Sequence, residues 1–400
     1  MSTNLNPRPI HRQAQWVAAA LAAGLLVVAS ACSSSGQAAS TNNTIESTSA
    51  VAPTSVAPTT TVPQPDPALR PMLEGILHSH HDAGEFVGGR IALREPDGAI
   101  TEAVIGTKTL DPSSGTVDLD TPWNVGSITK TFVAVIVLQL ADEGRVDLDA
   151  PIAPYFPQMK DADRITTRML LQHTSGLNDY SYQPAVVNDQ HRVWTPDELI
   201  AVAQAAGPVG EPGGAFHYSN TNYIVLGELI RKVTGHSWDD EVHTRIVEPL
   251  GLTHTGVVGS DMAPGFVPAN GSFVDATHSE DPSLGGSAGA MQSTGRDLLT
   301  FITAIEDGTL LSPESQQAMQ TFVPGEDYSQ FGITHSYGLG FEKYANDTIT
   351  VEGHMGTGAA HEAFVGFDPA RGTAVAVTLN TNNPGPQAFM AVEALTGAAS

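Results

Sequence analysis

The pattern of apolar and polar positions predicts strands near both ends of the folded part and helices between them. Short apolar runs of strand length occur at residues 89–93, 99–105, 348–352, 362–367 and 373–379. The first two flank a Pro-Asp-Gly sequence that is typical of a hairpin turn. We therefore expect an α/β (α+β) fold: both chain ends build one antiparallel β-sheet flanked by helices, with an inserted helical subdomain at about 140–290.

The predicted helices are marked by their end signals. The clearest helix starts at Thr195-Pro196-Asp197-Glu198, which combines an N-cap, proline at the first helical position and glutamate at the third. Another helix runs from about 221 to 233 and ends at Gly235, a residue typical of helix ends. Two more helices are expected over 66–81 and 386–395.

The amino-terminal segment has the pattern of an export signal. Two arginines precede an apolar run over 16–29, which is too short to cross a bilayer comfortably. The run ends on small residues before Cys32 and resembles a bacterial lipobox, with Ala29 where leucine is preferred. We therefore expect a lipoprotein signal peptide over 1–32 and a lipid anchor on Cys32 at the outer face of the cytoplasmic membrane. Ordinary export with a chance cysteine is the alternative.

The next segment, residues 33–66, is dominated by Ser, Thr, Ala and Pro. Such a composition cannot bury a core, so we expect a disordered tether. Residues 67–400 remain for the folded part, a length at which one core usually divides into two subdomains.

Composition narrows the functional classes. The chain has 400 residues, with 18 Lys and Arg against 43 Asp and Glu, a formal charge of −25 and one cysteine. Nucleic-acid binding rests on clustered Lys and Arg, so we expect no nucleic-acid partner. A single cysteine excludes an internal disulfide and a thiolate zinc site. An acidic body is also repelled by anionic lipid, so the predicted anchor would have to supply the attachment to the membrane.

Candidate chemistry begins at Ser127, in front of a helix that is apolar on every side and therefore buried. Lys130 follows three residues later and shares one face of the helix with this serine. A serine hydroxyl becomes a good nucleophile when a neighbour takes its proton, and a buried amine with a lowered pKa can do so. The serine N–H, free at the helix start, would be one half of an oxyanion hole.

Two further segments carry polar groups suited to this chemistry. In Tyr218-Ser219-Asn220, the tyrosine oxygen can relay protons and the Asn220 amide can bind a substrate amide and hold the lysine. In His354-Met355-Gly356-Thr357, at a strand end, Gly356 lets the backbone approach a ligand and the Thr357 N–H could complete the oxyanion hole. Tyr344 and Asn346 repeat the spacing of the first segment, but they lie in the polar stretch 342–347, which we interpret as a solvated turn.

In this order, the S-x-x-K, Y-x-N and H-x-G segments resemble the serine β-lactamase and penicillin-binding superfamily. Flanking sequences such as Leu170-Leu171-Gln172-His173-Thr174-Ser175-Gly176-Leu177 are similar to its class C side, above all to actinobacterial D-alanyl-D-alanine carboxypeptidases. The resemblance implies an acyl-serine hydrolase without metal or cofactor, acting on a small-molecule or peptidoglycan-type substrate. It makes Ser127 the nucleophile, Lys130 the base and Tyr218 the proton relay, with Asn220 and His354 in support. We expect a monomer.

Two departures from this family put its usual activity in question. The third motif has Met355 where the family carries a hydroxyl, and Glu342 follows Tyr337-Gly338-Leu339-Gly340-Phe341 where the carboxypeptidases place an arginine that binds a carboxylate. An esterase or amidase that acts on a neutral-tailed substrate is therefore an alternative to a carboxypeptidase or penicillinase. An alternative of another class is a non-catalytic cell-wall-binding lipoprotein.

Two other groupings are weaker candidates. Ser287 has the spacing of a nucleophile elbow, but no strand is predicted in front of it, so a glycine-rich loop beside the active site is the preferred interpretation. His78, His80, His81 and Asp82 crowd together like metal ligands, yet they end a predicted helix. We interpret them as a solvated helix terminus.

Overall fold

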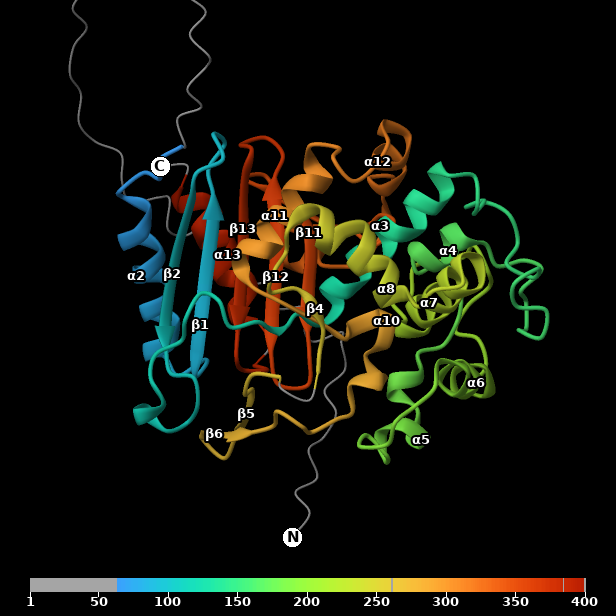
Figure 1. The fold of residues 1–400 in the computed structure, drawn as a ribbon, viewed down its shortest axis with the longest axis horizontal. Coiled ribbons are helices and arrows are strands. Elements are labelled where there is room, and N and C mark those ends of the chain that lie inside the picture. Colours follow the sequence, from blue (N-terminus) through green and yellow to red (C-terminus); the bar gives the residue numbers. More distant parts are fainter. Residues whose placement is uncertain (1–62, 260–261, 384, 399–400) are drawn as a thin grey trace, which may run out of the picture.

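The computed structural model describes residues 63–259, 262–383 and 385–398, which form a large antiparallel sheet with helices on both faces (Figure 1). The predicted signal peptide, Cys32 and most of the predicted tether lie outside the described residues. Among the residues that are described, no helix is both long and apolar enough to cross a membrane.

The large sheet has eight strands in the order β2-β1-β13-β12-β11-β10-β9-β8. These are β1 (Gly88–Arg94), β2 (Ile100–Gly106), β8 (Val323–Pro324), β9 (Thr334–Tyr337), β10 (Glu342–Ala345), β11 (Thr350–Thr357), β12 (Glu362–Asp368) and β13 (Thr373–Leu379). Strand β1, from the start of the fold, pairs with β13 from its end, and Ile91 lies opposite Val377. The prediction that both chain ends build one antiparallel sheet is confirmed.

Two short sheets accompany the large one. The first joins β3 (Trp123–Asn124), β7 (Met291–Ser293) and β4 (Gly256–Val257), and the second joins β5 (Phe266–Ala269) and β6 (Ser272–Asp275). The first matters for the site, because β3 leads directly into the segment that carries Ser127.

Helices cover both faces of the large sheet and fill the middle of the chain (Figure 1). On one face, α2 (Leu69–Asp82) and α13 (Pro386–Gly397) pack together, and α11 (Gly295–Glu306) covers the other face. The remaining helices are α3 (Thr129–Asp142), α4 (Thr167–Leu171), α5 (Pro184–Val187), α6 (Pro196–Ala206), α7 (Asn220–Thr234), α8 (Trp238–Val242), α9 (Glu248–Leu250), α10 (Gly286–Gly289) and α12 (Pro313–Met319).

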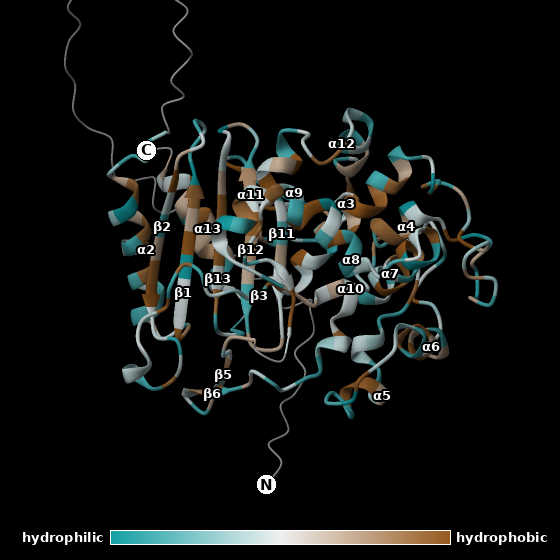
Figure 2. Cartoon of the chain, viewed as in Figure 1, coloured by the Kyte–Doolittle hydropathy of each residue, from teal (hydrophilic) through white to brown (hydrophobic). Residues whose placement is uncertain are grey.

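Helix α3 lies at the centre of the larger of two hydrophobic cores. Its residues from Thr129 to Leu138 are all buried, as predicted for a helix that is apolar on every side, and Figure 2 shows its hydrophobic character. The second core lies between the sheet and the pair α2 and α13.

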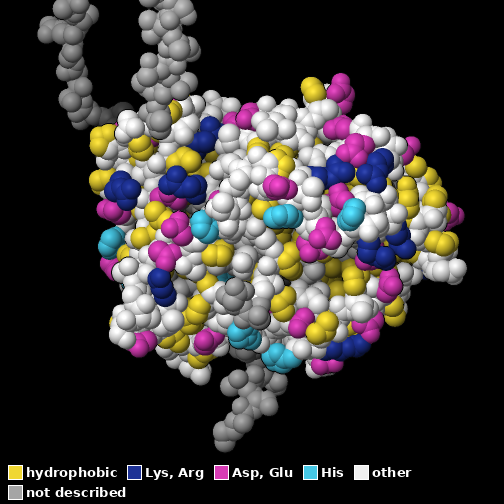
Figure 3. All heavy atoms as spheres, in the orientation of Figure 1, with side chains coloured by type: hydrophobic (Ala, Val, Ile, Leu, Met, Phe, Trp, Pro, Cys, Tyr) yellow, Lys and Arg dark blue, Asp and Glu magenta, His cyan; other side chains and the backbone are white. Residues whose placement is uncertain are grey.

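Acidic and basic side chains are scattered over the surface seen in Figure 3, and the Lys and Arg side chains on this face are not gathered into one patch.

Capping residues in the sequence predicted the start of one helix and the end of another correctly. The predicted capping box of α6 is present, with the Thr195 hydroxyl bonded to the N–H of Glu198 and the Glu198 carboxylate bonded to the N–H of Thr195. Helix α7 ends at Gly235 in the left-handed conformation, which glycine adopts without strain.

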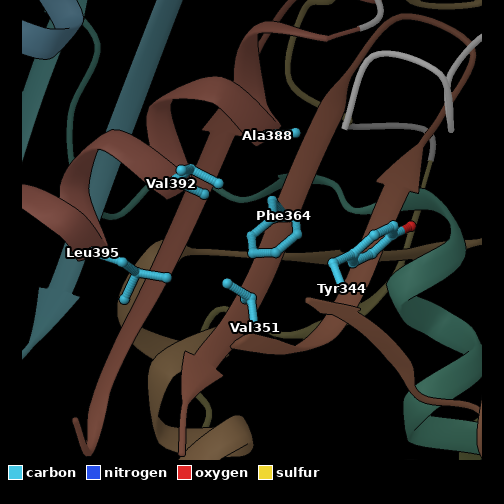
Figure 4. Close-up of a pocket in the computed structure, with 7 residues that line it drawn as sticks. Tyr344, Val351, Phe364, Ala388, Val392 and Leu395 are labelled. Carbon is cyan, nitrogen blue, oxygen red and sulfur yellow. The ribbon is translucent and has the colours of Figure 1, made fainter. Parts of the chain in front are cut away.

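The interpretation of residues 342–347 as a solvated turn is wrong. Glu342–Ala345 form strand β10, and Tyr344 is buried. Its ring lines a small apolar pocket together with Val351, Phe364 and helix α13 (Figure 4). The prediction failed because the two buried positions of this strand are an acid and an aromatic ring. Its four residues therefore do not show the alternation of apolar and polar side chains that indicates a half-buried strand.

Candidate active site

Ser127 lies in a 3₁₀ turn, Gly126–Ile128, that leads into α3, and its side chain is partly exposed. The turn is pressed against strand β11. A Cβ atom on Gly126, whose φ is +51°, would lie 2.4 Å from the Thr357 carbonyl oxygen, and one on Gly356 would lie 1.9 Å from the Val125 carbonyl oxygen. Two glycines therefore let the serine backbone and the strand meet. The sequence analysis had assigned Gly356 to the approach of a ligand, whereas the contact seen here joins strand β11 to the turn that carries Ser127.

Lys130 lies one turn further along and is fully buried. Its Nζ donates to Ser127 Oγ at 2.9 Å, to Asn220 Oδ1 at 2.8 Å and to the Ala288 carbonyl oxygen at 2.8 Å. Burial lowers the pKa of Lys130 to about 7, although the charges of Asp179 and Glu342 act in the opposite direction. A large fraction of this amine is therefore neutral near pH 7, as a proton acceptor must be.

Tyr218 is also close to the lysine, with its ring centroid 4.9 Å from Lys130 Nζ. Burial raises the pKa of Tyr218 well above its ordinary value, and a hydrogen bond with Ser127 acts in the opposite direction. The phenol is therefore neutral and in contact with the serine hydroxyl. Structure and sequence agree in bringing Ser127, Lys130, Tyr218 and Asn220 together.

Asn220 opens helix α7 and has an acidic neighbour that the sequence analysis missed. Its backbone N–H and its Nδ2 both donate to Asp179 Oδ2, at 3.0 and 3.1 Å. Asp179 is buried, and it precedes the 3₁₀ turn Tyr180–Tyr182. An aspartate in a polar loop has no sequence signal that separates it from a surface residue.

His354 is buried, and its ring is held at both nitrogens. Its Nδ1 donates to the Met355 carbonyl oxygen at 2.6 Å, and the Tyr337 hydroxyl donates to its Nε2 at 2.9 Å. Burial, followed by the charge of Lys130, lowers the pKa of His354 to about 3. His354 is therefore a neutral side chain with a fixed orientation at the site, and it does not supply a positive charge at physiological pH.

Glu342 and Met355 are the two residues that depart from the family pattern. Glu342 is buried, and its Oε2 accepts the N–H of Met355 at 3.0 Å, at the point where β10 stops pairing with β11. Burial raises the pKa of this carboxyl to about 7. The Met355 side chain packs against the core between the sheet and the pair α2 and α13. Glu342 is thus a buried acid rather than an exposed anion, and the Met355 side chain contributes to the packing of a hydrophobic core.

The two weaker candidate groupings have structural roles. Ser287 is buried in α10, where its Oγ donates to the Tyr223 carbonyl oxygen, and a 3₁₀ turn rather than a strand precedes it. The next residue, Ala288, supplies the carbonyl that Lys130 contacts, so this segment borders the site. At the end of α2, His80 contacts the carboxylates of Glu85 and Glu393. Within the described ranges, no group of three or more His, Cys, Asp and Glu side chains is arranged to hold a metal ion.

Comparison with known proteins agrees with this geometry. The model of the family described as Beta-lactamase matches residues 73–399. The chain belongs to the beta-lactamase family of serine hydrolases. A penicillin-binding protein of Bacillus subtilis (strain 168) is 29% identical over 226 residues, which cover 55% of this chain and 53% of that protein. The match therefore spans about half of that relative.

Two solved structures of beta-lactamase-like fold are similar over nearly their whole length. A D-stereospecific amidohydrolase from Streptomyces sp. is 30% identical with a TM-score of 0.72, covering 84% of this chain and 100% of that one. A D-amino acid amidase from Ochrobactrum anthropi SV3, complexed with L-phenylalanine amide, is 27% identical with a TM-score of 0.75, covering 83% of this chain and 100% of that one. The predicted superfamily and fold class are thereby confirmed.

Proposed function

We propose that this member of the beta-lactamase family forms an acyl-enzyme on Ser127 and hydrolyses amides or esters whose leaving group carries no carboxylate. The observation that carries the proposal is the contact of a fully buried lysine with the partly exposed serine hydroxyl, at 2.9 Å. A lysine in that place, with a pKa of about 7, is suited to take the serine proton.

The first half of the reaction would run through three groups. As neutral Lys130 takes the proton of Ser127, Oγ attacks the substrate carbonyl carbon. The resulting oxyanion would lie between the N–H groups of Ser127 and Thr357, which the close contact of Gly126 with β11 brings near each other. When the tetrahedral intermediate collapses, Tyr218 gives its proton to the leaving amine or alcohol and regains one from the Lys130 ammonium.

The second half would release the acyl group. A water molecule loses a proton to the same Tyr218 and Lys130 pair, and its oxygen attacks the acyl carbon. The Ser127 oxygen then leaves and recovers its proton. The original serine proton has departed with the leaving group, and a proton from the water replaces it, so Ser127, Lys130 and Tyr218 all end in their starting protonation states.

The charges around Ser127 support a substrate with a neutral tail. Asp179 and Glu342 are buried acids whose charges raise the pKa of Lys130. The lysine Nζ already donates hydrogen bonds to three acceptors within the site. Neutral His354 offers no charge. A terminal carboxylate would find no free cation among these residues to offset its charge, whereas an amide or ester tail would need none. The amidase and amidohydrolase among the similar structures point to the same bond type.

A substrate panel tests this proposal. The panel comprises D- and L-amino acid amides, short-chain p-nitrophenyl esters, peptides ending in D-Ala-D-Ala and a chromogenic cephalosporin, each followed with intact-mass detection of the acyl-enzyme. We expect kcat/KM for amides or esters to exceed that for the peptides by about tenfold or more. Efficient release of D-Ala with little amide or ester cleavage would show instead that the enzyme is a carboxypeptidase.

We also propose that the protein is exported as a lipoprotein with Cys32 as its acylated first residue. The support is the sequence alone: a basic flank, a short apolar run and small residues that end at the chain's single cysteine. Detergent phase partitioning of the wild type and of Cys32→Ser tests it. A Cys32→Ser protein that still enters the detergent phase would show that another feature anchors the chain.

A further inference from the structure

The carboxylate of Asp179 has its hydrogen-bonding capacity filled on both oxygens. Oδ1 accepts from the backbone N–H and the hydroxyl of Ser181, both at 2.8 Å. Oδ2 accepts from the backbone N–H and the Nδ2 of Asn220, at 3.0 and 3.1 Å. Four donors therefore surround this carboxylate inside the protein and favour its charged form, although burial acts in the opposite direction and raises the pKa of Asp179.

This arrangement fixes which way the Asn220 amide points. Its Nδ2 faces Asp179 and Ser181 Oγ, at 3.1 and 3.4 Å, so its Oδ1 faces Lys130 Nζ at 2.8 Å. If the amide were flipped, its NH₂ group would face the lysine and its oxygen would face the carboxylate. Both contacts would then be unfavourable, and in a buried place such mismatches are costly.

We propose that Asp179 is a positioning residue for the reaction: it locks the Asn220 amide so that an acceptor always faces Lys130, and it places one negative charge behind that amide. The oriented Asn220 oxygen and the Ala288 carbonyl engage two N–H bonds of a neutral Lys130. Ser127 Oγ, to which the protonated amine donates at 2.9 Å, then becomes the donor to the lone pair of the neutral nitrogen. Asp179 thus acts on the serine through two intermediaries.

The inference rests on the proposed acyl-serine chemistry but not on the proposed substrate, so the test uses a fluorophosphonate probe. The probe reports the nucleophilicity of Ser127 whatever the natural substrate is. The rate constant for labelling is measured between pH 5 and 10 on the full chain, with near-ultraviolet circular dichroism and thermal unfolding recorded for each variant. Labelling that persists in Ser127→Ala would refute the acyl-serine proposal rather than the role of Asp179.

The decisive variant is Asp179→Asn, which keeps the shape and replaces one acceptor by a donor. We expect labelling to slow by about tenfold or more, and the pH midpoint to move downward, because the carboxylate that raised the pKa of Lys130 has lost its charge. Ser181→Ala removes one of the four donors to Asp179 and the longer contact of Asn220 Nδ2 with Ser181 Oγ, but it keeps the charge of Asp179 and both bonds between Asn220 and Asp179. It is the matched control and should keep the wild-type midpoint. Wild-type labelling by Asp179→Asn, or slower labelling with an unchanged midpoint, would overturn the proposal.

A second variant exchanges the two side chains, Asp179→Asn with Asn220→Asp, and covers the case in which the single variant does not fold. The side-chain pair is complementary again, although the backbone N–H of residue 220 loses its acceptor. The charge now lies directly against Lys130, so the midpoint should rise above that of the wild type. A midpoint at or below the wild-type value in the exchanged protein would contradict the proposal.

Discussion

The ring of His173 lies face to face with the ring of Tyr218, with the centroids 4.3 Å apart and the planes inclined by 27°. His173 is completely buried, and its Nδ1 accepts hydrogen bonds from the N–H of Ser219 and from Asn222 Nδ2. These bonds place the ring proton on Nε2, and burial keeps the pKa of His173 well below its ordinary value. A neutral, immobile ring therefore supports the tyrosine that we propose as the proton relay.

Replacing this support should slow catalysis more than binding. In His173→Leu we expect kcat to fall by about tenfold with little change in KM, because Tyr218 loses a stacking partner worth about 1 kcal/mol and gains freedom to tilt. Steady-state kinetics on the best substrate of the panel measures both constants. His335→Leu is the matched control, since His335 is also buried and stacked on a tyrosine, Tyr344, at 4.7 Å. If both variants lose kcat equally, the effect reflects general packing.

The pH profile should have an acidic limb with a midpoint near 7. Lys130 has a pKa lowered to about 7, so it is protonated below that pH and cannot take the Ser127 proton. We expect kcat/KM to fall tenfold per pH unit below the midpoint and to level off above it. Lys130→Arg should be inactive at every pH, because guanidinium does not release its proton.

Glu342 titrates in the same range and can be separated from Lys130 by substitution. In Glu342→Gln the side-chain oxygen can still accept the Met355 N–H, while the negative charge near Lys130 is removed. The midpoint should therefore move to lower pH, with the limb retained. Loss of the limb in the Glu342→Gln profile would identify Glu342, not Lys130, as the group whose ionisation controls the rate.

The two candidate serines should differ completely in their effects. Ser127→Ala should abolish hydrolysis and labelling by a fluorophosphonate. Ser287→Ala should keep substantial activity, because this hydroxyl only bonds the Tyr223 carbonyl oxygen inside the fold, and its loss should cost about 1 kcal/mol of stability. Intact-mass spectrometry after labelling distinguishes the two, and a labelled Ser127→Ala protein would contradict the assignment.

The contact between β11 and the nucleophile segment should tolerate no side chain at Gly356. A Cβ there would lie 1.9 Å from the Val125 carbonyl oxygen, so Gly356→Ala must push the strand away from Ser127. We expect labelling to slow by at least about a hundredfold, with lowered thermal stability. Gly75→Ala is the control, since that helical glycine has nothing within 4 Å of the added methyl group and should gain up to about 1 kcal/mol. Normal labelling of Gly356→Ala would show that the strand does not set the geometry of the site.

Sequence reasoning found the residues that belong to recognisable short motifs and missed the partners that lie outside those motifs. Ser127 and Lys130 are one helical turn apart, so their contact follows from spacing alone. Asp179 is more than forty residues from Asn220, and no motif in the sequence marks it. His173 lies in a segment that resembles the family, but its stacking on Tyr218 could not be read from that segment. Glu342 was located as an unusual residue, but its burial could not be read from a polar stretch.

In the fold, sequence reasoning found the elements with clear turn and capping signals and missed the shortest strands. The hairpin of β1 and β2 and the helix ends of α6 and α7 depend on turn and capping residues that the sequence displays. The extension of the sheet through β10, β9 and β8 depends on pairing with β11, and those strands are two to four residues long. Runs so short carry too few alternations to predict a strand.

The pairing of β1 with β13 also governs the order in which the molecule can fold. Arg90 meets Thr378 only after almost three hundred intervening residues have been synthesised, so the middle of the sheet is missing until the last strand emerges from the ribosome. Until then, the inner edge of the first hairpin lacks its final partner. Such a topology closes long loops before it gains its central contacts and is expected to fold slowly. An incomplete chain of this protein is therefore a natural substrate for chaperones and proteases.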